Sequence, residues 1–424
     1  MAQSFWFKLD NAAKLYPAVA TSRWSSNFRM SAELESPVEP EILQQALDLT
    51  IPRFPSMNVQ LKAGVFWYYL EQTPKRLLVQ QDSGHPCMPF SNKRDNGFLL
   101  RVFYFRRRIS VEFFHVVTDG TGGLTFLKTL LVTYLRLLGH DVSYDNGALD
   151  ISATPDEEET IDAFQHIPLP DVRISRKHER AWHFPATRAI PHTLNLVAAS
   201  IPADALLEEA HRMQVTFTEY LTALILYTAC QCQAAEKKKP MPVRVSVPVN
   251  MRGFYPIATL RNFSSFVNPG VDPRLGEYTL EEICSCVHSF MAYHLTKKQL
   301  SGAIATNVAE EKPILVRLAP LFIKNLAIAS VFRRSGDLQV TSTLSNVGRT
   351  GIPTGADALV RRFEFLLGSP YAALCNCACI CSKDEVRLTF SSNILETTLP
   401  RRLLCTLVEM GIPVTVESND QEDV

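Results

Sequence analysis

The chain has 424 residues, in which 43 lysines and arginines balance 43 aspartates and glutamates. A chain with no net charge and no basic-aromatic module is not expected to bind nucleic acid. Its length allows a large apolar core in two or three lobes, and its 46% of hydrophobic residues is typical of a globular protein.

The N-terminal segment, MAQSFWFKLDNAAKLYPA, has no charged region followed by an apolar stretch, so no signal peptide is predicted. No uninterrupted apolar run approaches the roughly 20 residues that a transmembrane helix needs. The apolar segment Ile314–Phe332 is interrupted by Arg317, Pro320 and Lys324, which favours a buried helix over an interfacial one. We therefore expect a cytoplasmic protein without a transmembrane segment.

The first part of the chain is predicted to form strands and a helix around a central hairpin. A strand is expected at Asn27–Leu34 and a helix at Glu39–Thr50. The segments Leu99–Phe105 and Ile109–Val117 are predicted to pair as a hairpin, with the arginine triplet between them as its turn.

The strand that begins at Ile109 is followed by a sharp turn and a helix. Apolar and polar residues alternate along ISVEFFHVV, which places His115 on the buried face of the strand. Asp119 and Gly120 end this pattern, and leucines recur at helical spacing from Leu124 onward. A lone histidine on an apolar face is ordinarily a buried core residue. A chemical role for His115 therefore depends on partners elsewhere in the chain.

Between about residues 150 and 190 the composition changes. The acidic run Asp156–Glu159 is followed by Pro168, Pro170 and a basic stretch at Arg173–Arg188. Charge blocks and prolines with little apolar periodicity indicate a linker or crossing loop.

The second half of the chain is predicted to be a further set of alternating strands and helices. Strands are expected at Thr193–Ile201, Val243–Val249, Leu338–Leu344, Tyr371–Cys381 and Glu385–Phe390, and helices at Ala203–Met213, Thr218–Ala234, Thr279–Leu300 and Pro400–Met410.

A faint internal repeat links the two halves. Val386–Thr397 has the strand-and-turn pattern of Ile109–Gly120, with Ser392 opposite His115, although two strands can also resemble each other by chance.

The cysteines do not suggest disulfides or a metal site. Four of them alternate in the segment CNCACIC, from Cys375 to Cys381, and a strand would place all four in a row on one face. Such a row cannot converge on a tetrahedral zinc ion. Buried thiols on a core strand are the favoured interpretation, and the cysteine usage suits a reducing compartment.

The spacing His115-x-x-x-Asp119-Gly120 resembles the signature of the acyltransferase superfamily that includes chloramphenicol acetyltransferase, plant BAHD enzymes, alcohol acetyltransferases and peptide condensation domains. The best overall match is to bacterial alcohol acetyltransferase-like proteins, through the segments WFKLDNAAKLYPA, RFPSMNVQL, PVNMRGFYP and LRNF. Phe114 stands where condensation domains usually have a first histidine, and Asn58 where they often have an arginine. The Asp-Phe-Gly-Trp-Gly segment of the BAHD enzymes is missing.

The resemblance implies a salt bridge between Asp119 and Arg252. In the superfamily, a Val-Asn-x-Arg segment brings an arginine to the aspartate of the motif, and Arg252 holds that position in VNMR. A carboxylate in a tight buried turn is costly without a partner, so pairing would hold the turn and fix the imidazole. Arg101 is the reserve partner.

Ser345 is the candidate for contact with the oxyanion. The segment TSTLSNVG looks like the Ser-Asn-x-Gly segment of dihydrolipoyl and related acyltransferases, in which a hydroxyl of one lobe faces the histidine of the other. Thr343 and Ser342 are alternative donors, and an ordinary turn is the alternative explanation of Ser-Asn-Val-Gly.

The resemblance implies an α/β fold of two chloramphenicol-acetyltransferase-like lobes, each a mixed sheet flanked by helices, with an active-site tunnel between them. We expect an N-terminal lobe at residues 1–160, a linker or crossing loop at 161–190, and a C-terminal lobe at 191–424.

The expected activity is transfer of an acyl group from an acyl thioester to an alcohol or amine, catalysed directly by His115 as general base. Acyl-CoA is the expected co-substrate, and neither a permanently bound cofactor nor a metal is expected. The length of the acyl chain and the acceptor are left open.

Other classes of function remain open from the sequence. The protein could be a catalytically silent binding or scaffold protein of the same fold, or a condensation-type enzyme that uses a carrier-protein thioester. A hydrolase would lack the usual Gly-x-Ser-x-Gly motif. Phosphate binding at the glycine-rich helix start Gly120–Gly123 would lack the lysine of a P-loop.

Overall fold

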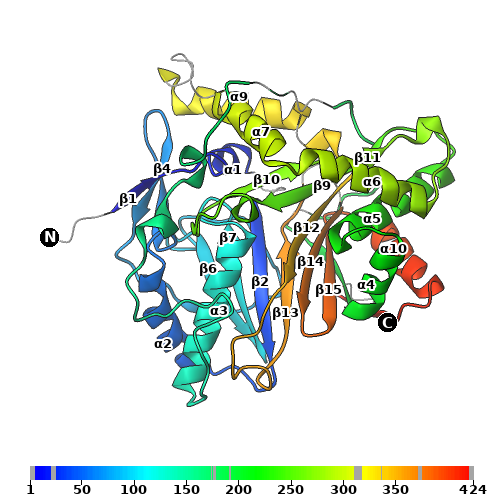
Figure 1. The fold of residues 1–424 in the computed structure, drawn as a ribbon. Coiled ribbons are helices and arrows are strands. Elements are labelled where there is room, and N and C mark those ends of the chain that lie inside the picture. The colour runs from blue at the N-terminus through cyan, green and yellow to red at the C-terminus, as the bar shows by residue number, and fades with distance from the viewer. Residues whose placement is uncertain are drawn as a thin grey trace.

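The computed structural model describes residues 5–20, 25–172, 174, 178–190, 192–309, 318–335, 337–370 and 375–419. Their strands form two mixed sheets and a small third sheet, and helices cover the outer faces of the two mixed sheets (Figure 1). The predicted α/β class, with mixed sheets flanked by helices in two lobes, is confirmed.

The first sheet has the strand order β13-β2-β7-β6-β5 within the described residues. β5 is parallel to β6, and the other neighbours are antiparallel. On β2 and β7, Phe28 pairs with Phe113 and Met30 with Val111, so one face of both strands is apolar and packs beneath the helices. The strands are β2 (Asn27–Leu34), β5 (Val79–Gln81), β6 (Leu100–Phe105), β7 (Arg108–Phe114) and β13 (Val360–Leu367), and the helices are α2 (Pro40–Thr50) and α3 (Gly120–Leu137).

The opposite face of β7, which carries the polar residues Ser110 and Glu112, is buried as well. Glu112 accepts hydrogen bonds from Arg29 Nε at 2.9 Å and from Arg101 Nη1 at 2.9 Å. These arginines compensate for burying the carboxylate. Arg101, the reserve partner for Asp119, is thus engaged by Glu112 and also by Asp95.

The second sheet has the order β10-β9-β12-β14-β15-β8-β16, with β11 beside β9. β12 is parallel to both of its neighbours, β9 and β14. The strands are β8 (Asn195–Pro202), β9 (Val243–Asn250), β10 (Ser264–Val267), β11 (Gly270–Val271), β12 (Ser342–Arg349), β14 (Cys375–Ser382), β15 (Glu385–Ser392) and β16 (Thr415–Ser418).

The helices of the second sheet are α4 (Ala203–Arg212), α5 (Phe217–Ala235), α6 (Leu280–His294) and α10 (Thr398–Glu409), which gather on one side of it in Figure 1. α5 and α6 each begin with a capping box, in which a threonine and the glutamate three residues later satisfy each other's backbone N–H groups. The expected helix Thr279–Leu300 is wrong as a single element, because α6 ends at His294 and α7 (Lys297–Ala309) begins after a short break.

β14 separates the two hydrophobic cores. The four alternating cysteines, Cys375 to Cys381, lie in the core of the second lobe, whereas Ala378 and Ile380 on the opposite face of the strand lie in the core of the first. The predicted row of buried thiols on one face of a strand is confirmed for the described residues 375–381. Residues 371–374 of that expected strand lie outside the described residues.

β13 crosses from the second half of the sequence to the first sheet. It pairs antiparallel with β2, where Phe363 lies opposite Ala32 and Phe365 opposite Met30. The sequence analysis had assigned no strand to this segment. The first sheet therefore includes a strand from outside residues 1–160, and the domain boundaries remain a prediction.

The remaining elements are a small sheet and short helices. The small sheet has the order β1-β4-β3 and lies beside the first sheet. Its strands are β1 (Trp6–Lys8), β3 (Val59–Ala63) and β4 (Tyr68–Gln72), and the short helices are α1 (Leu15–Val19) and 3-10 turns at Ile51–Arg53, Glu157–Thr160, Ala163–Gln165, Met251–Gly253, Pro273–Leu275 and Asp337–Gln339.

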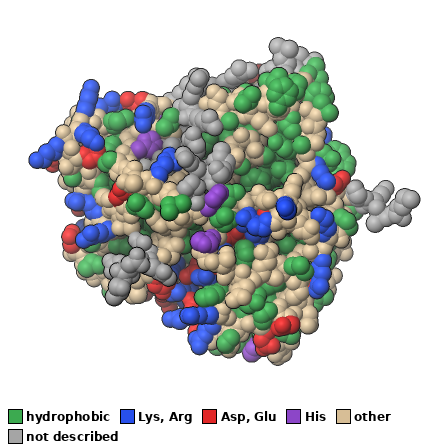
Figure 2. Space-filling view, turned by 180° about the vertical axis from the view of Figure 1, so that it is seen from behind, with side chains coloured by type: hydrophobic (Ala, Val, Ile, Leu, Met, Phe, Trp, Pro, Cys, Tyr) green, Lys and Arg blue, Asp and Glu red, His purple; other side chains and the backbone are tan. Residues whose placement is uncertain are grey.

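The expected burial of the apolar segment Ile314–Phe332 is wrong for its described part. In α9 (Leu321–Ser335), Phe322 is 66% exposed and Leu326 is 70% exposed. Lys324 is buried instead, and its Nζ donates to the carbonyl oxygen of Phe66 at 2.8 Å. Figure 2 shows hydrophobic side chains gathered on this part of the surface, at the upper right. None of the described helices is long and apolar enough to cross a membrane.

Candidate active site

His115 lies in the turn that follows β7, beside the first residues of β2. Its backbone N–H donates to the carbonyl oxygen of Ser26 at 2.8 Å. The imidazole stacks on Tyr16 with ring centroids 4.6 Å apart, and it lies at 66° to the ring of Phe28 with centroids 5.2 Å apart. Contacts to the backbone and to the ring therefore hold His115 in place.

Asn262 of the second half binds His115 twice. The Nδ1 atom of the histidine lies 2.8 Å from the Oδ1 atom of Asn262, and the Asn262 Nδ2 atom donates to the His115 carbonyl oxygen at 2.9 Å. Burial lowers the pKa of His115, although the Asp119 carboxylate and the Asn262 hydrogen bond oppose this effect. A lowered pKa keeps the imidazole neutral near pH 7, the form that can accept a proton.

Asp119 is the N-cap of α3. Its Oδ1 atom accepts from the backbone N–H groups of Thr121 at 3.1 Å and Gly122 at 3.2 Å. Its Oδ2 atom accepts from the Phe263 backbone at 2.8 Å and from Arg252 Nη1 at 2.8 Å. The carboxylate thus ties the turn after His115 to the second half of the chain.

Arg252 is the expected partner of Asp119, and the predicted ion pair is present. The other nitrogens of its guanidinium bind backbone carbonyl oxygens. Nε and Nη2 donate to Thr259 at 2.9 and 2.7 Å, and Nη2 also donates to Arg261 at 2.7 Å. The ion pair therefore fixes the loop that carries Asn262.

Gly122 allows the start of α3 to approach this loop. A Cβ atom at Gly122 would lie 2.3 Å from the Leu260 carbonyl oxygen and 2.2 Å from the Thr118 hydroxyl. That hydroxyl donates to the same carbonyl at 2.7 Å. Glycine is required here by close approach of two backbones.

Ser345 lies on the face of β12 that points toward the first lobe. Leu344 is in the core of the second lobe, and the Asn346 side chain reaches Thr218 at the start of α5. Because side chains alternate along a strand, Ser345 faces the other way. Val347 shares that face and packs against Gly120, where a Cβ would lie 3.1 Å from it.

The two alternative donors differ in the structure. Ser342 is fully buried, and its hydroxyl donates to the Cys375 carbonyl oxygen at 2.6 Å. Thr343 is partly exposed and shares the Ser345 face by strand alternation. Thr343 remains an alternative to Ser345, whereas Ser342 is already engaged.

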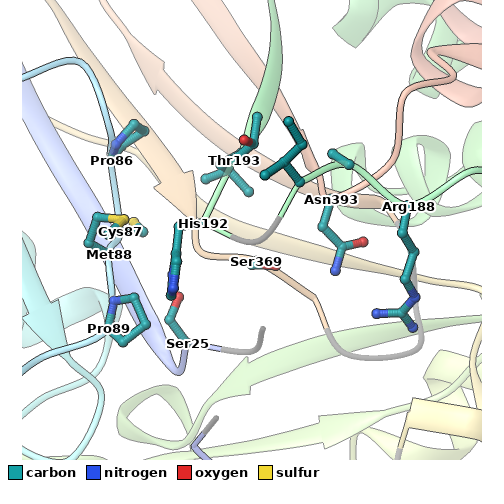
Figure 3. Close-up of a pocket in the computed structure, with 13 residues that line it drawn as sticks. Ser25, Pro86, Cys87, Met88, Pro89, Arg188, His192, Thr193, Ser369 and Asn393 are labelled. Carbon is teal, nitrogen blue, oxygen red and sulfur yellow. The ribbon is translucent and has the colours of Figure 1, made fainter. Parts of the chain in front are cut away.

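A cavity of about 250 Å³ opens where the two lobes meet (Figure 3). Ser25, the neighbour of the residue that binds the His115 backbone, lines one side. Arg188, which precedes β8, and Asn393, which follows β15, also line it (Figure 3). His115, Asn262 and Ser345 are not among the described residues that line the cavity, and its connection to the site is through the backbone of Ser25 and Ser26.

The helix start at Gly120 is not arranged as a phosphate cradle, because Asp119 already occupies the N–H groups of Thr121 and Gly122. Among the described residues, no group of three or more histidines, cysteines or acidic residues is placed to hold a metal ion.

The structure resembles solved proteins over nearly its whole length. TRI101 of F. graminearum, solved with coenzyme A and T-2 mycotoxin, aligns with a TM-score of 0.66 and 12% identity, covering 98% of this chain and 99% of that one. TRI3 trichothecene 15-O-acetyltransferase from Fusarium sporotrichioides aligns with a TM-score of 0.61 and 12% identity, covering 96% and 94%. The condensation domain of the monacolin K polyketide synthase MokA aligns with a TM-score of 0.60 and 11% identity, covering 96% of both.

The chain has the fold of CoA-dependent acyltransferases and condensation domains. No protein-family model and no curated protein sequence matches it. Structural similarity at this identity establishes the fold of the acyltransferases, and the chemistry must be argued from the site.

The structure adds contacts that the sequence analysis missed. Asn262 was noted only as part of the LRNF segment, and Tyr16 only within the N-terminal segment. The available signal is the match of the LRNF segment to the family, with Asn262 ten residues after Arg252.

Proposed function

We propose that the protein transfers an acyl group from acyl-CoA to the hydroxyl or amino group of a small acceptor. The observation that carries this proposal is the geometry of His115 in an acyltransferase fold, with Nδ1 bound to Asn262 and the ring stacked on Tyr16. Burial lowers the pKa of this imidazole, which favours the neutral form that a general base needs. Support for CoA as the donor comes from the structures of TRI101 with coenzyme A.

In the proposed reaction, His115 Nε2 takes the proton from the acceptor as its oxygen or nitrogen attacks the thioester carbonyl carbon. The carbonyl electron pair moves to oxygen and forms a tetrahedral oxyanion. When the intermediate collapses, the C–S bond breaks and the CoA thiolate takes the proton from the imidazolium. The acyl group thus ends on the acceptor and the proton on the CoA thiol, and no acyl-enzyme forms.

Ser345 is the proposed donor to the oxyanion, with Thr343 as the alternative on the same face of β12. One such donor typically contributes roughly 3–4 kcal/mol to stabilisation of the transition state. Asp119 and Arg252 have a positioning role in this scheme, because their contacts are with each other, with backbone groups and with the side chain of Asn250. The cavity beside Ser25 is the proposed approach for one of the two substrates.

Two alternatives share this fold. A condensation-type enzyme would take its acyl group from a carrier-protein thioester, as the likeness to a condensation domain allows. A catalytically silent scaffold would bind ligands between the lobes without transferring an acyl group.

The test is to incubate the full chain with acetyl-CoA and longer acyl-CoAs and a panel of alcohols and amines. Free thiol and acylated product are measured together. Equal amounts of thiol and product that depend on the acceptor support the proposal. Thiol release without an acceptor would indicate a thioesterase. Binding of CoA with no turnover would support the scaffold, and transfer only from a carrier-protein thioester would support the condensation-type enzyme.

A further inference from the structure

The orientation of the Asn262 amide is fixed by its surroundings. Its Nδ2 atom faces the His115 carbonyl oxygen at 2.9 Å and the Asp10 Oδ2 atom at 3.2 Å. Both partners accept hydrogen bonds, and a carbonyl oxygen has no proton to donate in any state. The NH2 group must therefore face them, and Asn262 Oδ1 must face the imidazole.

The orientation of the amide sets the tautomer of His115. Asn262 Oδ1 is an acceptor 2.8 Å from Nδ1, so the neutral ring carries its proton on Nδ1. The lone pair is then on Nε2. A ring in the other tautomer would place two acceptors against each other and would leave no base on Nε2.

Asp10 is held by two separate N–H groups. One carboxylate oxygen accepts from the Ala13 backbone at 2.7 Å, and the other accepts from Asn262 Nδ2. The Arg261 guanidinium lies 3.5 Å from this second oxygen. Asp10 is fully buried, so these contacts replace water around the carboxylate.

If Asp10 served only to accept the Ala13 backbone N–H, burying its charge would cost free energy without need. Burial raises the pKa of Asp10 to about 6, against the opposing effect of Arg261, so the ionised form is disfavoured at this position. A neutral serine or asparagine would cap the same turn without that cost. The second oxygen of Asp10 has a use that those residues would not supply, which is its hydrogen bond to Asn262.

We propose that Asp10 is a positioning residue for His115 and acts through Asn262. Asp10 holds the amide of Asn262 in one orientation, and Asn262 in turn holds the Nδ1–H tautomer of His115. The same N-terminal segment supplies Tyr16, which stacks on the imidazole. The segment Leu9–Val19 thus contacts the imidazole directly through Tyr16 and indirectly through Asp10 and Asn262. The catalytic consequence of this positioning rests on the proposed function.

The first test is the tautomer itself. The full chain is labelled with 15N at the histidine rings, and the ring nitrogens are observed by long-range 1H–15N correlation near pH 7, with His115→Gln used to assign the signal. In the wild-type protein, Nδ1 carries the proton. Asp10→Asn is nearly isosteric but keeps one acceptor oxygen for two N–H groups. We expect a measurable fraction of the Nε2–H tautomer in this variant.

The second test is kinetic, with acyl-CoA and an acceptor that the wild-type protein uses. Asp10→Asn should lower kcat by about 10- to 100-fold and leave KM for acyl-CoA unchanged, because the change acts on the orientation of the base. Asp95→Asn is the matched control. Asp95 is also a buried loop carboxylate that accepts a backbone N–H, from Ser91, and pairs with Arg101. At temperatures at which it is folded, the Asp95→Asn variant should have the wild-type tautomer of His115 and the wild-type kcat.

A double-mutant cycle shows whether Asp10 acts through Asn262. In the Asn262→Ala background, Asp10→Asn should cause no further change in the tautomer or in kcat. The proposal is overturned if Asp10→Asn leaves the tautomer of His115 unchanged, or if it lowers kcat by the same factor in both backgrounds. The NMR result needs no turnover. A protein that transfers no acyl group but shows the tautomer response would refute the proposed function and leave the positioning role standing.

Discussion

Arg252 binds the Asp119 carboxylate with one nitrogen and the carbonyl oxygens of Thr259 and Arg261 with the others. Asp119 in turn accepts from the Phe263 backbone. The two residues are 133 positions apart and together close the junction between the turn after His115 and the loop of Asn262. The pair is therefore expected to contribute to stability and to the geometry of the base.

Arg252→Lys is expected to destabilise the protein by about 3 kcal/mol, because an ammonium cannot reach the aspartate and two carbonyl oxygens together and leaves a buried group unpaired. Denaturant unfolding measures the change. Arg274→Lys is the control, since its ion pairs with Asp272 and Glu179 are partly exposed and should contribute much less to stability. Equal losses for the two variants would contradict the structural role of Arg252.

Gly122→Ala is expected to destabilise the protein by about 2 kcal/mol or more and to lower transfer activity. Its new methyl group would meet the Leu260 carbonyl oxygen, which is backbone and cannot rotate away. Gly253→Ala is a suitable control, because nothing lies within 4 Å of a Cβ atom there and its φ is not positive. Thermal unfolding of both variants measures the difference. A wild-type melting temperature for Gly122→Ala would show that the two backbones are not as close as described.

Ser345→Ala is expected to lower kcat by about 10²- to 10³-fold with little change in stability. The proposed hydrogen bond of this hydroxyl forms only with the oxyanion of the transition state and not within the folded protein. Ser342→Ala should have the opposite effect, with lower stability and an unchanged kcat, since its hydroxyl binds the Cys375 carbonyl oxygen in the core. Steady-state kinetics and unfolding curves separate the two effects. An unchanged kcat for Ser345→Ala and a reduced one for Thr343→Val would move the oxyanion contact to Thr343.

The stability of the protein should depend on Asp10 between about pH 4 and pH 6. The pKa of Asp10 rises from the ordinary 3.8 to about 6 on folding, so the folded state binds the proton more tightly. Its contribution to stability is therefore greatest at low pH and falls as the pH rises through this window, by up to about 3 kcal/mol. Arg261 opposes this shift and Asp162 adds to it.

The contribution of His115 to folding stability changes with pH in the opposite direction. Its pKa is lowered in the folded state, so its contribution is present above its ordinary pKa of 6.5 and is lost as the pH falls. Asp10→Asn should remove the fall that begins near pH 4 and leave the His115 part in place. Unfolding free energies of wild type and Asp10→Asn, measured from pH 4 to 7, test this difference. Parallel curves would contradict the raised pKa.

Hydrophobic periodicity predicted the strands and helices that pack one apolar face against a core. β2 was placed at its observed bounds, and α4, α5, β9 and α10 were placed within about two residues, because each alternates or repeats its apolar residues against one core. The faint repeat also has a structural counterpart, since β15 leads into α10 as β7 leads into α3.

Other elements could not be predicted because long-range contacts determine them. β13 reads VRRFEFLL, and two of its charged residues pair with other strands, Arg362 with Glu33 of β2 at 2.8 Å and Glu364 with Arg387 of β15 at 3.3 Å. The apolar residues of α9 suggested burial, yet they face outward while Lys324 is covered by the ring of Trp67. Periodicity indicates that a face is apolar but not which side of the molecule it meets.

Only part of the site could be predicted, because some of its contacts are between residues far apart in the sequence. The ion pair of Asp119 with Arg252 followed from the motif, because a buried carboxylate needs a cation. Asn262 and Asp10 carry no comparable signal, since an asparagine and an aspartate in loops ordinarily serve turns. Their role depends on a contact between residues 252 positions apart.

The most direct test of the account is the transfer activity of His115→Ala and His115→Gln beside wild type, with acyl-CoA and the best acceptor of the panel. Unfolding curves confirm that each variant is folded at the assay temperature. If His115 is the general base, both variants lose about 10²- to 10⁴-fold in kcat. Full transfer activity in folded His115→Ala would contradict the mechanism.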